Sequence, residues 1–265
     1  LAFAEGRFVS ASVAACVPAG EAGMPTMEFY RRQIILGLRD YARRCGFSRV
    51  VVGSSGGIDS ALTIALAVEA LGADNVVGIT MPSKFSSAGS VDDSVVLCRN
   101  LGVRLIEHPI RDLVAAYSDG FAAAFDAPLK GLPQENLQAR VRGTILMEYS
   151  NAFGHLLLTT GNKSEMAVGY ATLYGDMAGG FAVIKDVVKT MVFRLAWWRN
   201  ANDPYGTGSN PIPERIITRP PSAELRPDQK DQDSLPPYEV LDAIVERYME
   251  NDEPVEDIVR AGFAH

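Results

Sequence analysis

The sequence predicts an α/β fold in which helices cover both faces of a doubly wound parallel sheet. First, short runs rich in valine, isoleucine and leucine alternate with longer segments whose apolar residues recur every three or four positions. Second, glycine follows most of the helical segments, as is typical of helix ends. Third, a chain of 265 residues that is 47% hydrophobic can bury a large core. Because crossovers join alternating strands and helices, the sheet is expected to be parallel.

The first predicted regular element is a helix at residues 27–45. Its apolar residues lie three and four positions apart: Ile34, Ile35, Leu38, Tyr41, Ala42 and Cys45. The residues before it are small and apolar, with glycine and proline but without a sustained period. We therefore expect residues 1–26 to be a connector or the remnant of an upstream domain, and residues 27–265 to be the folded domain. The chain begins with Leu1 rather than methionine, which suggests a piece of a longer polypeptide.

The alternation of strands and helices continues along the chain. Short apolar runs predict buried strands at residues 49–52, 75–81, 103–108 and 155–160. Helical spacing predicts helices at residues 58–71, 91–101, 110–125, 134–153, 164–168, 185–198, 238–249 and 254–261. Residues 200–237 are rich in proline, aspartate and asparagine and predict a long loop, which in a compact domain is usually functional or disordered.

Charge and composition exclude several classes of function. The net charge is −7 and the pI is about 5.1, which argues against nucleic-acid binding. No apolar run is long enough to cross a membrane, and the first 20 residues lack the basic-then-apolar order of a signal peptide. Cys16, Cys45 and Cys98 have no metal-binding spacing and suit a reducing compartment. We therefore expect a cytoplasmic protein without a membrane or nucleic-acid partner.

Residues 53–60, Gly-Ser-Ser-Gly-Gly-Ile-Asp-Ser, join the first predicted strand to the next helix and permit two interpretations. The pattern G-x-S-x-G around Ser55 is typical of a serine nucleophile on a tight turn. Such a nucleophile needs a histidine, but the three histidines end a strand, begin a strand and end the chain: His108, His155 and His265. This interpretation also gives Asp59 and Ser60 no role. We therefore favour the second one, a phosphate-binding loop.

A phosphate-binding loop gives every residue of this stretch a role. Its three glycines allow the backbone to turn sharply and to direct successive N–H groups to one place, and the next helix adds the positive end of its dipole. Ser55 and Ser60 can donate hydrogen bonds to phosphate oxygens. Asp59 fits beside a phosphate if a cation lies between them, which predicts a Mg²⁺ ligand. The loop lacks the lysine of a Walker site. The structural alternative is a glycine turn in which Asp59 and Ser60 only cap the helix.

The six residues from Ser55 to Ser60 match the S-G-G-x-D-S signature of the PP-loop ATP pyrophosphatases, which have an adenine nucleotide alpha hydrolase-like fold. Three further stretches resemble the synthetase domain of the NAD synthetase family. They are MPSKFSS (81–87), TTGNKSEMAVGYATLYGD (159–176) and RIITRPPSAELRPDQKDQDSLPPYEVLDAI (215–244). The chain is most similar to the glutamine-dependent, two-domain members, and the resemblance extends from about residue 27 to the end.

This resemblance implies a ligase that forms a carbon–nitrogen bond and converts deamido-NAD to NAD. In this family the carboxylate of deamido-NAD attacks the α-phosphate of ATP, pyrophosphate leaves, and ammonia, free or derived from glutamine, displaces AMP from the acyl-adenylate. Catalysis then depends on neutralising and aligning charges around phosphate. Two alternatives stay open. One is another PP-loop enzyme, either GMP-synthetase-like or tRNA-modifying, and the other is a nucleotide-binding module without turnover.

The resemblance also implies roles for individual residues. Asp59, Glu165 and Lys189 are the expected catalytic residues, and Asp59 and Glu165 are the expected ligands of Mg²⁺. The residues expected to bind ATP are Gly53, Ser54, Ser55, Gly56, Gly57, Ile58, Asp59, Ser60, Met81, Thr160, Lys189 and Ser222. The residues expected to bind deamido-NAD are Asn136, Arg140, Glu165, Tyr170, Ala171, Thr172, Leu173 and Asp176. Residues 82–87 would form a flap over the phosphates.

The partners implied by the resemblance are small molecules and a second copy of the chain. The small molecules are ATP, deamido-NAD, and ammonia or glutamine, and deamido-NAD would bind at the interface of a homodimer. Three features depart from the family pattern. Ser54 replaces a residue that is often bulky and apolar, residues 1–26 contain no Glu-Lys-Cys amidase site, and no basic tail follows the last helix. We therefore expect a synthetase domain that lacks both an N-terminal glutamine amidotransferase domain and the C-terminal tail, and that would use free ammonia.

Overall fold

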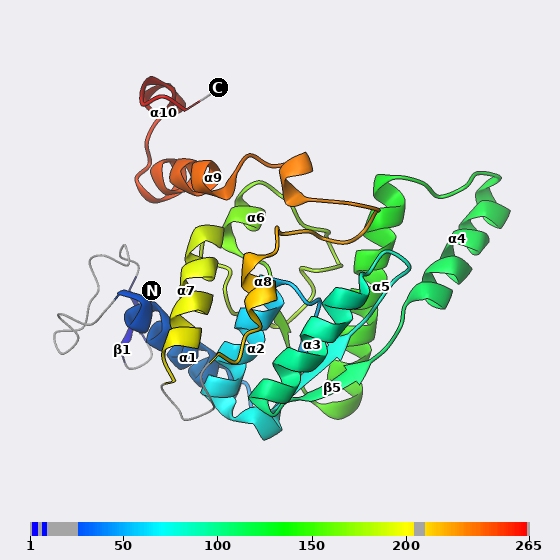
Figure 1. Ribbon diagram of the computed structural model, residues 1–265, viewed down its shortest axis with the longest axis horizontal. Helices are drawn as coiled ribbons and strands as arrows, with labels where there is room; N and C mark the ends of the chain where they lie inside the picture. The colour runs from blue at the N-terminus through cyan, green and yellow to red at the C-terminus, as the bar shows by residue number, and fades with distance from the viewer. Residues whose placement is uncertain (1, 5–6, 10–25, 204–209, 264–265) are drawn as a thin grey trace.

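A parallel sheet forms the centre of the computed structural model, which describes residues 2–4, 7–9, 26–203 and 210–263 (Figure 1). Within these residues the sheet has five strands in the order β5-β4-β3-β6-β7, and every neighbouring pair is parallel. The strands are β3 (Val50–Gly53), β4 (Val76–Thr80), β5 (Arg104–Glu107), β6 (Leu156–Thr159) and β7 (Phe181–Ala182). The chain runs outward from β3 to β5 and then crosses back to β6 and β7. This order confirms the predicted doubly wound sheet.

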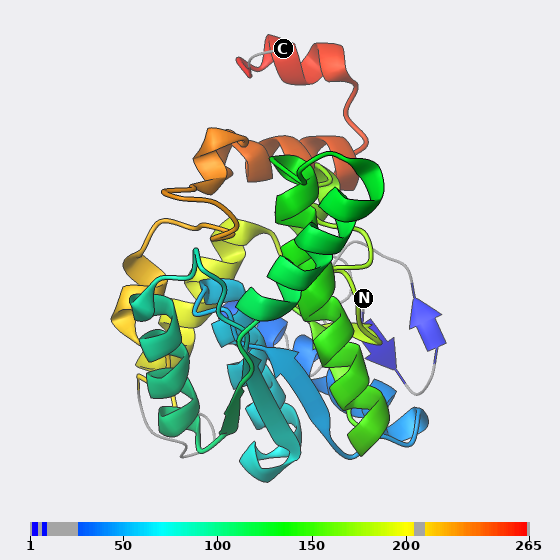
Figure 2. The ribbon, with the colours of Figure 1, turned by 90° about the vertical axis from the view of Figure 1, so that its right-hand side faces the viewer.

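The two faces of the sheet carry separate cores, because side chains along a strand alternate between faces. Val50 and Val52 of β3 belong to one core, whereas Val51 belongs to the other. The helices of the first face are α1 (Thr26–Arg44), α2 (Ile58–Leu71), α3 (Ala88–Leu101) and α7 (Lys189–Ala201). The second face is covered by α5 (Leu132–Phe153), with α4 (Arg111–Phe125) beside it (Figure 2). The prediction of helices on both faces is therefore confirmed.

Helix α2 is buried along most of its length and is tied to its two neighbours by ion pairs. Glu69 of α2 pairs with Arg31 of α1, at 2.9 Å between Oε2 and Nη1, and with Arg199 of α7. All three side chains are buried, where a charge without a partner would be costly. These ion pairs fix α2 relative to α7, and both helices begin at the site described below.

Residues 219–250 pass over the carboxyl edge of the sheet. Helix α9 (Tyr238–Val245) packs on α6 (Lys163–Ala167) and α7, and continues as a π-helical turn (Glu246–Glu250). Helix α10 (Val255–Arg260) lies beyond it, at the end of the chain in Figure 1. The remaining short elements are η2 (Ala73–Asn75), α8 (Glu214–Thr218), η3 (Asp231–Asp233), and the antiparallel pair β1 (Ala2–Ala4) and β2 (Arg7–Val9).

The structure differs from the sequence-based expectations in three elements. The helix predicted at residues 185–198 begins at Lys189, because the apolar residues before it form a turn that is buried against the sheet. Strand β7 was not predicted, since its two residues are too few for an alternating pattern. The predicted loop at residues 200–237 contains α8 and η3, so it is more regular than its proline content indicates.

The proposed domain boundary at residue 26 stays a prediction, because most of the residues before it lie outside the described part of the chain. Helix α1 begins at Thr26, close to the predicted start of the folded domain. Among the helices that the structure describes, none combines the length and the apolar character needed to cross a bilayer.

Candidate active site

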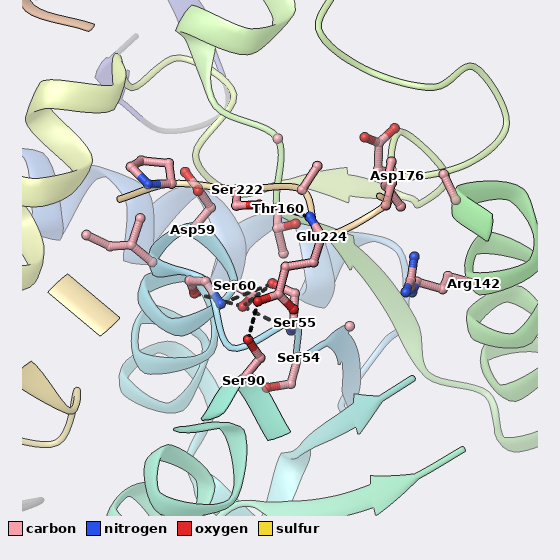
Figure 3. A pocket seen from close by; sticks show the side chains of 18 of the residues that line it. Ser54, Ser55, Asp59, Ser60, Ser90, Arg142, Thr160, Asp176, Ser222 and Glu224 are labelled. Carbon is pink, nitrogen blue, oxygen red and sulfur yellow. Dashed lines mark hydrogen bonds between the residues drawn. The ribbon is translucent and has the colours of Figure 1, made fainter. Parts of the chain in front are cut away.

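A cavity of about 260 Å³ opens at the carboxyl ends of β3, β4 and β6 (Figure 3). The chain reverses its direction across the sheet between the neighbouring strands β3 and β6, and this is where doubly wound folds bind ligands. The loop after β3 forms one wall, and α5 forms the wall that carries Arg142. The segment 219–225 runs across the cavity, and Ser222 and Glu224 of this segment line it.

The loop after β3 is held by its own serines. Ser60 Oγ accepts a hydrogen bond from the Ser55 backbone N–H (3.3 Å) and donates one to the Gly57 carbonyl (3.0 Å). Ser55 Oγ accepts a hydrogen bond from the Gly57 N–H (3.2 Å). Gly57 is the N-cap of α2 and has no side chain, so no side-chain oxygen caps this helix. The interpretation in which Asp59 and Ser60 only cap α2 is therefore wrong, and the first N–H groups of α2 face the cavity without a side-chain cap.

Among the described residues, no histidine lines the cavity. A serine nucleophile at Ser55 would need a histidine base within hydrogen-bond reach. The hydroxyl of Ser55 instead contacts the hydroxyl of Ser60, at 3.1 Å between the two oxygens. The structure thus supports the phosphate-binding interpretation of the loop over the nucleophile.

Gly56 occupies a position that other residues cannot take without strain. Its φ is +75°, and a Cβ atom there would lie 2.3 Å from the Ser90 carbonyl oxygen. We expect Gly56→Ala to lower the free energy of unfolding by about 1–2 kcal/mol, the cost of a left-handed backbone with a side chain. The clash would also displace the loop, so ATP affinity is expected to fall about 10-fold, equivalent to about 1.4 kcal/mol. Urea unfolding and fluorescence titration with ATP measure the two effects.

Gly57→Ala is the matched control for this substitution. Gly57 has a φ of −91°, and the nearest atom to an added Cβ is Ser55 Oγ at 3.3 Å, which a side-chain rotation can relieve. We expect the Gly57 variant to keep most of its stability and ATP affinity. Equal effects of the two substitutions would contradict the assigned role of the Gly56 conformation.

Asp59, Glu165 and Lys189 come together on one side of the cavity. Lys189 Nζ lies 2.5 Å from Asp59 Oδ2 and 3.2 Å from Glu165 Oε1. The Lys189 side chain is 1% exposed, whereas each carboxylate is 17% exposed. Burial opposes the charge of Lys189, but Asp59 and Glu165 together outweigh it and raise its pKa above the ordinary value. Burial, and then the nearby Asp59, raise the pKa of Glu165. The cluster thus holds a buried ammonium between two carboxylates that reach the cavity.

The local fold explains why these three residues meet. Each one lies in the first turn of its helix: Asp59 in α2, Glu165 in α6 and Lys189 in α7. Helices α2 and α6 follow β3 and β6, and the carboxyl ends of neighbouring parallel strands share one edge of the sheet.

Helix α9 holds the start of α7 in place. Asp242 of α9 accepts hydrogen bonds from the Ser164 hydroxyl (2.5 Å) and from the Thr190 N–H (2.7 Å). Ser164 Oγ in turn accepts one from the Lys189 N–H (2.8 Å). The Tyr238 ring lies 5.3 Å from Lys189 Nζ, so an aromatic face also covers the ammonium. Helix α9 therefore contributes to the position of Lys189.

The carboxylates of Asp59 and Glu165 fit a magnesium ion in chemical terms. Mg²⁺ prefers oxygen ligands and is usually held by one or two carboxylates together with phosphate oxygens, rather than by a complete protein cage. In the described part of the chain, no group of three or more metal-ligating side chains is found. Two ionised carboxylates with one lysine leave a net negative charge, which would attract a cation.

The residues expected to bind ATP gather at this cavity. All of them line it except Gly56, which is buried within the loop. Of the residues expected to bind deamido-NAD, Glu165, Tyr170 and Asp176 line the cavity, and the others do not. These others fasten the 170–176 segment to α5: Thr172 Oγ1 donates to Asn136 Oδ1 (3.0 Å), and Arg140 Nε donates to the Leu173 carbonyl (3.2 Å). Ala171 lies in the same segment.

Several residues at the site were not predicted from the sequence. Arg142 lines the cavity opposite the loop, and its Nε donates to the Met81 carbonyl at 3.2 Å. Burial lowers the pKa of Arg142 to about 10. Glu224 accepts a hydrogen bond from the Ser90 hydroxyl (2.6 Å), which joins the segment 219–225 to the start of α3. Arg219 also donates to Ser90 Oγ (2.8 Å). Arg219 and Glu224 belong to the 215–244 stretch that resembles the family, and this was the feature of the sequence that could have indicated them as site residues.

The fold and the site together define a class of protein. A doubly wound parallel sheet carries a glycine- and serine-rich loop without a Walker lysine. The aspartate of this loop and a second carboxylate contact the same buried lysine on one side of the cavity. This is the arrangement of a PP-loop ATP pyrophosphatase.

Comparison with known proteins identifies the family. The sequence model of NAD synthase matches residues 30–264, and the chain therefore belongs to the NAD synthase family. A glutamine-dependent NAD(+) synthetase of Thermotoga maritima is 53% identical over 232 residues, which cover 88% of this chain and 40% of the relative. The corresponding enzyme of Synechocystis is 52% identical over 231 residues, or 87% of this chain and 40% of the relative. The chain thus spans about two fifths of the length of these curated relatives.

Solved structures support the same assignment. The glutamine-dependent NAD+ synthetase of Acinetobacter baumannii, solved in complex with ADP, is 44% identical with a TM-score of 0.70, over 94% of this chain and 43% of that one. The NH3-dependent NAD synthetase of Campylobacter jejuni, solved with a nitrate ion, is 26% identical with a TM-score of 0.68, over 89% of this chain and 88% of that one. The fold is thus shared by relatives that use either source of nitrogen.

Proposed function

We propose that this chain uses ATP to amidate deamido-NAD to NAD, releasing AMP and pyrophosphate. The observation that carries the proposal is a single cavity that is lined by residues of the Ser55–Ser60 loop and by Glu165 and Lys189. Asp59 of the loop contacts Lys189 there, and Lys189 also contacts Glu165. Membership of the NAD synthase family supports the choice of substrate. The A. baumannii relative was solved with ADP, which supports an adenine nucleotide as the ligand of the loop.

The proposed chemistry has two steps. A carboxylate oxygen of deamido-NAD attacks the α-phosphorus of ATP, the bond to the β-phosphate oxygen breaks, and pyrophosphate leaves. The nitrogen of ammonia then attacks the carbonyl carbon of the acyl-adenylate, AMP leaves with the oxygen, and the nitrogen loses a proton. The first step makes AMP the leaving group in place of oxide, which a carboxylate could not expel.

The residues of this chain would act by binding and alignment rather than as nucleophiles. The N–H groups at the start of α2 and the hydroxyls of Ser55 and Ser60 would bind the β- and γ-phosphates. Lys189 would hold Asp59 and Glu165 in position, and these two carboxylates would hold Mg²⁺. When bound, Mg²⁺ supplies positive charge to the triphosphate. Arg142 would add a second positive charge from the α5 wall. These groups lower the barrier by stabilising charge on the phosphates and by aligning the substrates.

Three finer points complete the proposal. The nitrogen would come from ammonia, free or delivered by a glutamine amidotransferase domain, since the glutamine-dependent relatives are more than twice as long as their match to this chain. A homodimer that binds deamido-NAD at its interface, with Asn136 and Arg140 of α5 near it, stays a prediction from the family resemblance. A cytoplasmic location stays a prediction from the composition of the sequence.

The test of this function is pyrophosphate release with and without deamido-NAD. With ATP, Mg²⁺ and ammonium, we expect release only when deamido-NAD is present, with one NAD formed per pyrophosphate, as measured by a coupled phosphate assay and by mass spectrometry. Release that does not depend on deamido-NAD would overturn the proposed substrate. Tight ATP binding without any pyrophosphate would favour the nucleotide-binding module.

A further inference from the structure

We propose that Asn162 is a positioning residue that fixes the two carboxylates of the site, Asp59 and Glu165, for adenylation. The inference rests on the proposed function, and it assigns to Asn162 a role beyond capping helix α6. Asn162 lies between the end of β6 and the start of α6, and its side chain is completely buried. A buried amide beside two carboxylates must have each of its polar atoms paired, which makes its contacts informative.

Asn162 contacts both carboxylate residues at once. Its Nδ2 donates a hydrogen bond to Asp59 Oδ1 at 2.8 Å, across 103 residues of sequence. Its Oδ1 accepts one from the Glu165 N–H at 3.0 Å, and its own backbone N–H donates to Glu165 Oε2 at 3.4 Å. The last two contacts form the capping box of α6. The first lies outside that motif and has no part in capping.

Lys189 and Asn162 hold opposite oxygens of the same two carboxylates. Lys189 Nζ contacts Asp59 Oδ2 and Glu165 Oε1, whereas Asn162 binds Asp59 Oδ1 and Glu165 Oε2. The four groups therefore form a closed ring of hydrogen bonds. A lysine ammonium is a point charge on a flexible stem, and by itself it does not fix the rotation of a carboxylate. The side-chain amide of Asn162 supplies the second contact that sets the rotation of Asp59, and the Asn162 backbone N–H supplies it for Glu165.

The chemistry of the side chain explains why asparagine is needed. Ser, Thr and Asp cap helices about as well as Asn, because capping requires only an oxygen that accepts a hydrogen bond. Only asparagine in this group has that oxygen together with an NH₂ group on the same planar amide. The bond between Oδ1 and the Glu165 N–H orients the amide, so that Nδ2 points at Asp59. The hydrogen bond that caps α6 thus orients the Nδ2 donor of Asn162 toward the carboxylate of Asp59 in α2.

The expected consequence concerns the binding of a divalent cation. Without the Asn162 donor, Asp59 could turn both oxygens toward Lys189 and would be less available to a cation. Hydrogen bonds that orient ligating side chains typically change metal affinity or activity about 10- to 100-fold. The two substitutions Asn162→Ser and Asn162→Asp retain a capping oxygen and remove the NH₂ donor, so they separate positioning from capping. Asn162→Asp also places a negative charge against Asp59.

The experiment compares these two variants with the parent chain. We expect Asn162→Ser to lower kcat for deamido-NAD-dependent pyrophosphate release about 10- to 100-fold and to raise the Mg²⁺ concentration at half-maximal rate. The melting temperature should stay within a few degrees of the parent. Asn162→Asp should be affected more strongly. Asn75→Ser is the matched control, because the Asn75 amide donates to the Leu71 carbonyl (2.8 Å) just before β4, at the opposite edge of the sheet.

A second readout does not depend on turnover. Mn²⁺ can be titrated in the presence of ATP alone, and the concentration of free Mn²⁺ can be followed by electron paramagnetic resonance. We expect Asn162→Ser to bind Mn²⁺ about 10-fold more weakly than the parent chain. Parental Mn²⁺ affinity in both Asn162 variants would overturn the inference, as would a loss of activity that only follows a loss of folded protein. If the parent itself releases no pyrophosphate, the proposed function fails, while the Mn²⁺ titration still decides the role of Asn162.

Discussion

Asp59→Asn is expected to lower the rate of deamido-NAD-dependent pyrophosphate release about 100- to 1,000-fold, the range seen when a group that stabilises charge in a transition state is removed. The amide has nearly the same shape as the carboxylate but cannot offer a negative oxygen to a cation. It also leaves Lys189 with Glu165 as its one remaining carboxylate partner in the cluster. The coupled phosphate assay at saturating Mg²⁺ measures the effect.

The fold should survive this substitution, because Asp59 lies at the edge of a cavity and its side chain is 17% exposed. Circular dichroism and a thermal melt check this point. Asp74→Asn serves as a control of the same chemistry, since Asp74 is exposed in η2 before β4 and does not line the cavity. Full activity of the Asp59 variant would show that the carboxylate does not hold a cation during the reaction.

Lys189→Met is expected to lower the free energy of unfolding by about 3–5 kcal/mol, the typical cost of removing one partner from a buried ion pair. The side chain of Lys189 is 1% exposed and contacts two carboxylates. Methionine fills a similar volume, so the loss of packing is small. Asp59 and Glu165 would then repel each other beside the cavity without a cation between them. Urea unfolding followed by fluorescence measures this loss of stability, and pyrophosphate release should fall as well.

A double variant tests whether the cause is electrostatic. Adding Glu165→Gln to Lys189→Met removes one of the two negative charges that repel each other, so part of the lost stability should return. Lys185→Met, at an exposed position in the turn before α7, should leave stability nearly unchanged. If the double variant is less stable than Lys189→Met alone, charge repulsion is not the cause, and the contact of Lys189 with the Tyr238 ring becomes the better explanation.

The loop that we propose to bind phosphate could be recognised in the sequence because its residues are contiguous. Residues 53–60 combine three glycines, the two serines that we propose to bind phosphate and Asp59 in one strand–turn–helix unit, so one short stretch shows both the backbone geometry and the chemistry. The buried strands could also be predicted, since β3, β4 and β6 are short apolar runs with no competing helical period. Strand β7 could not be predicted, because two residues are too few to show a periodic pattern.

The roles of Asn162, Arg142 and Glu224 could not be predicted from sequence spacing. From the sequence, Asn162 is an ordinary helix cap. Only the fold places its Nδ2 at 2.8 Å from Oδ1 of Asp59, which lies 103 residues earlier in the chain. Arg142 lies on a long helix with other polar residues, and only the packing of α5 on the sheet turns it toward the cavity. Glu224 meets Ser90 because the segment 219–225 passes over the loop.

The fold class and the proposed chemistry could be predicted from the sequence alone, because the hydrophobic period and the Ser55–Ser60 motif are local properties of the chain. The tertiary structure decided how that chemistry is arranged. It placed Lys189 between Asp59 and Glu165, closed the ring of hydrogen bonds through Asn162, and anchored the start of α7 through Asp242 of α9. These contacts join residues that are far apart in sequence. They exist because the carboxyl ends of neighbouring parallel strands bring the starts of several helices to one edge of the sheet.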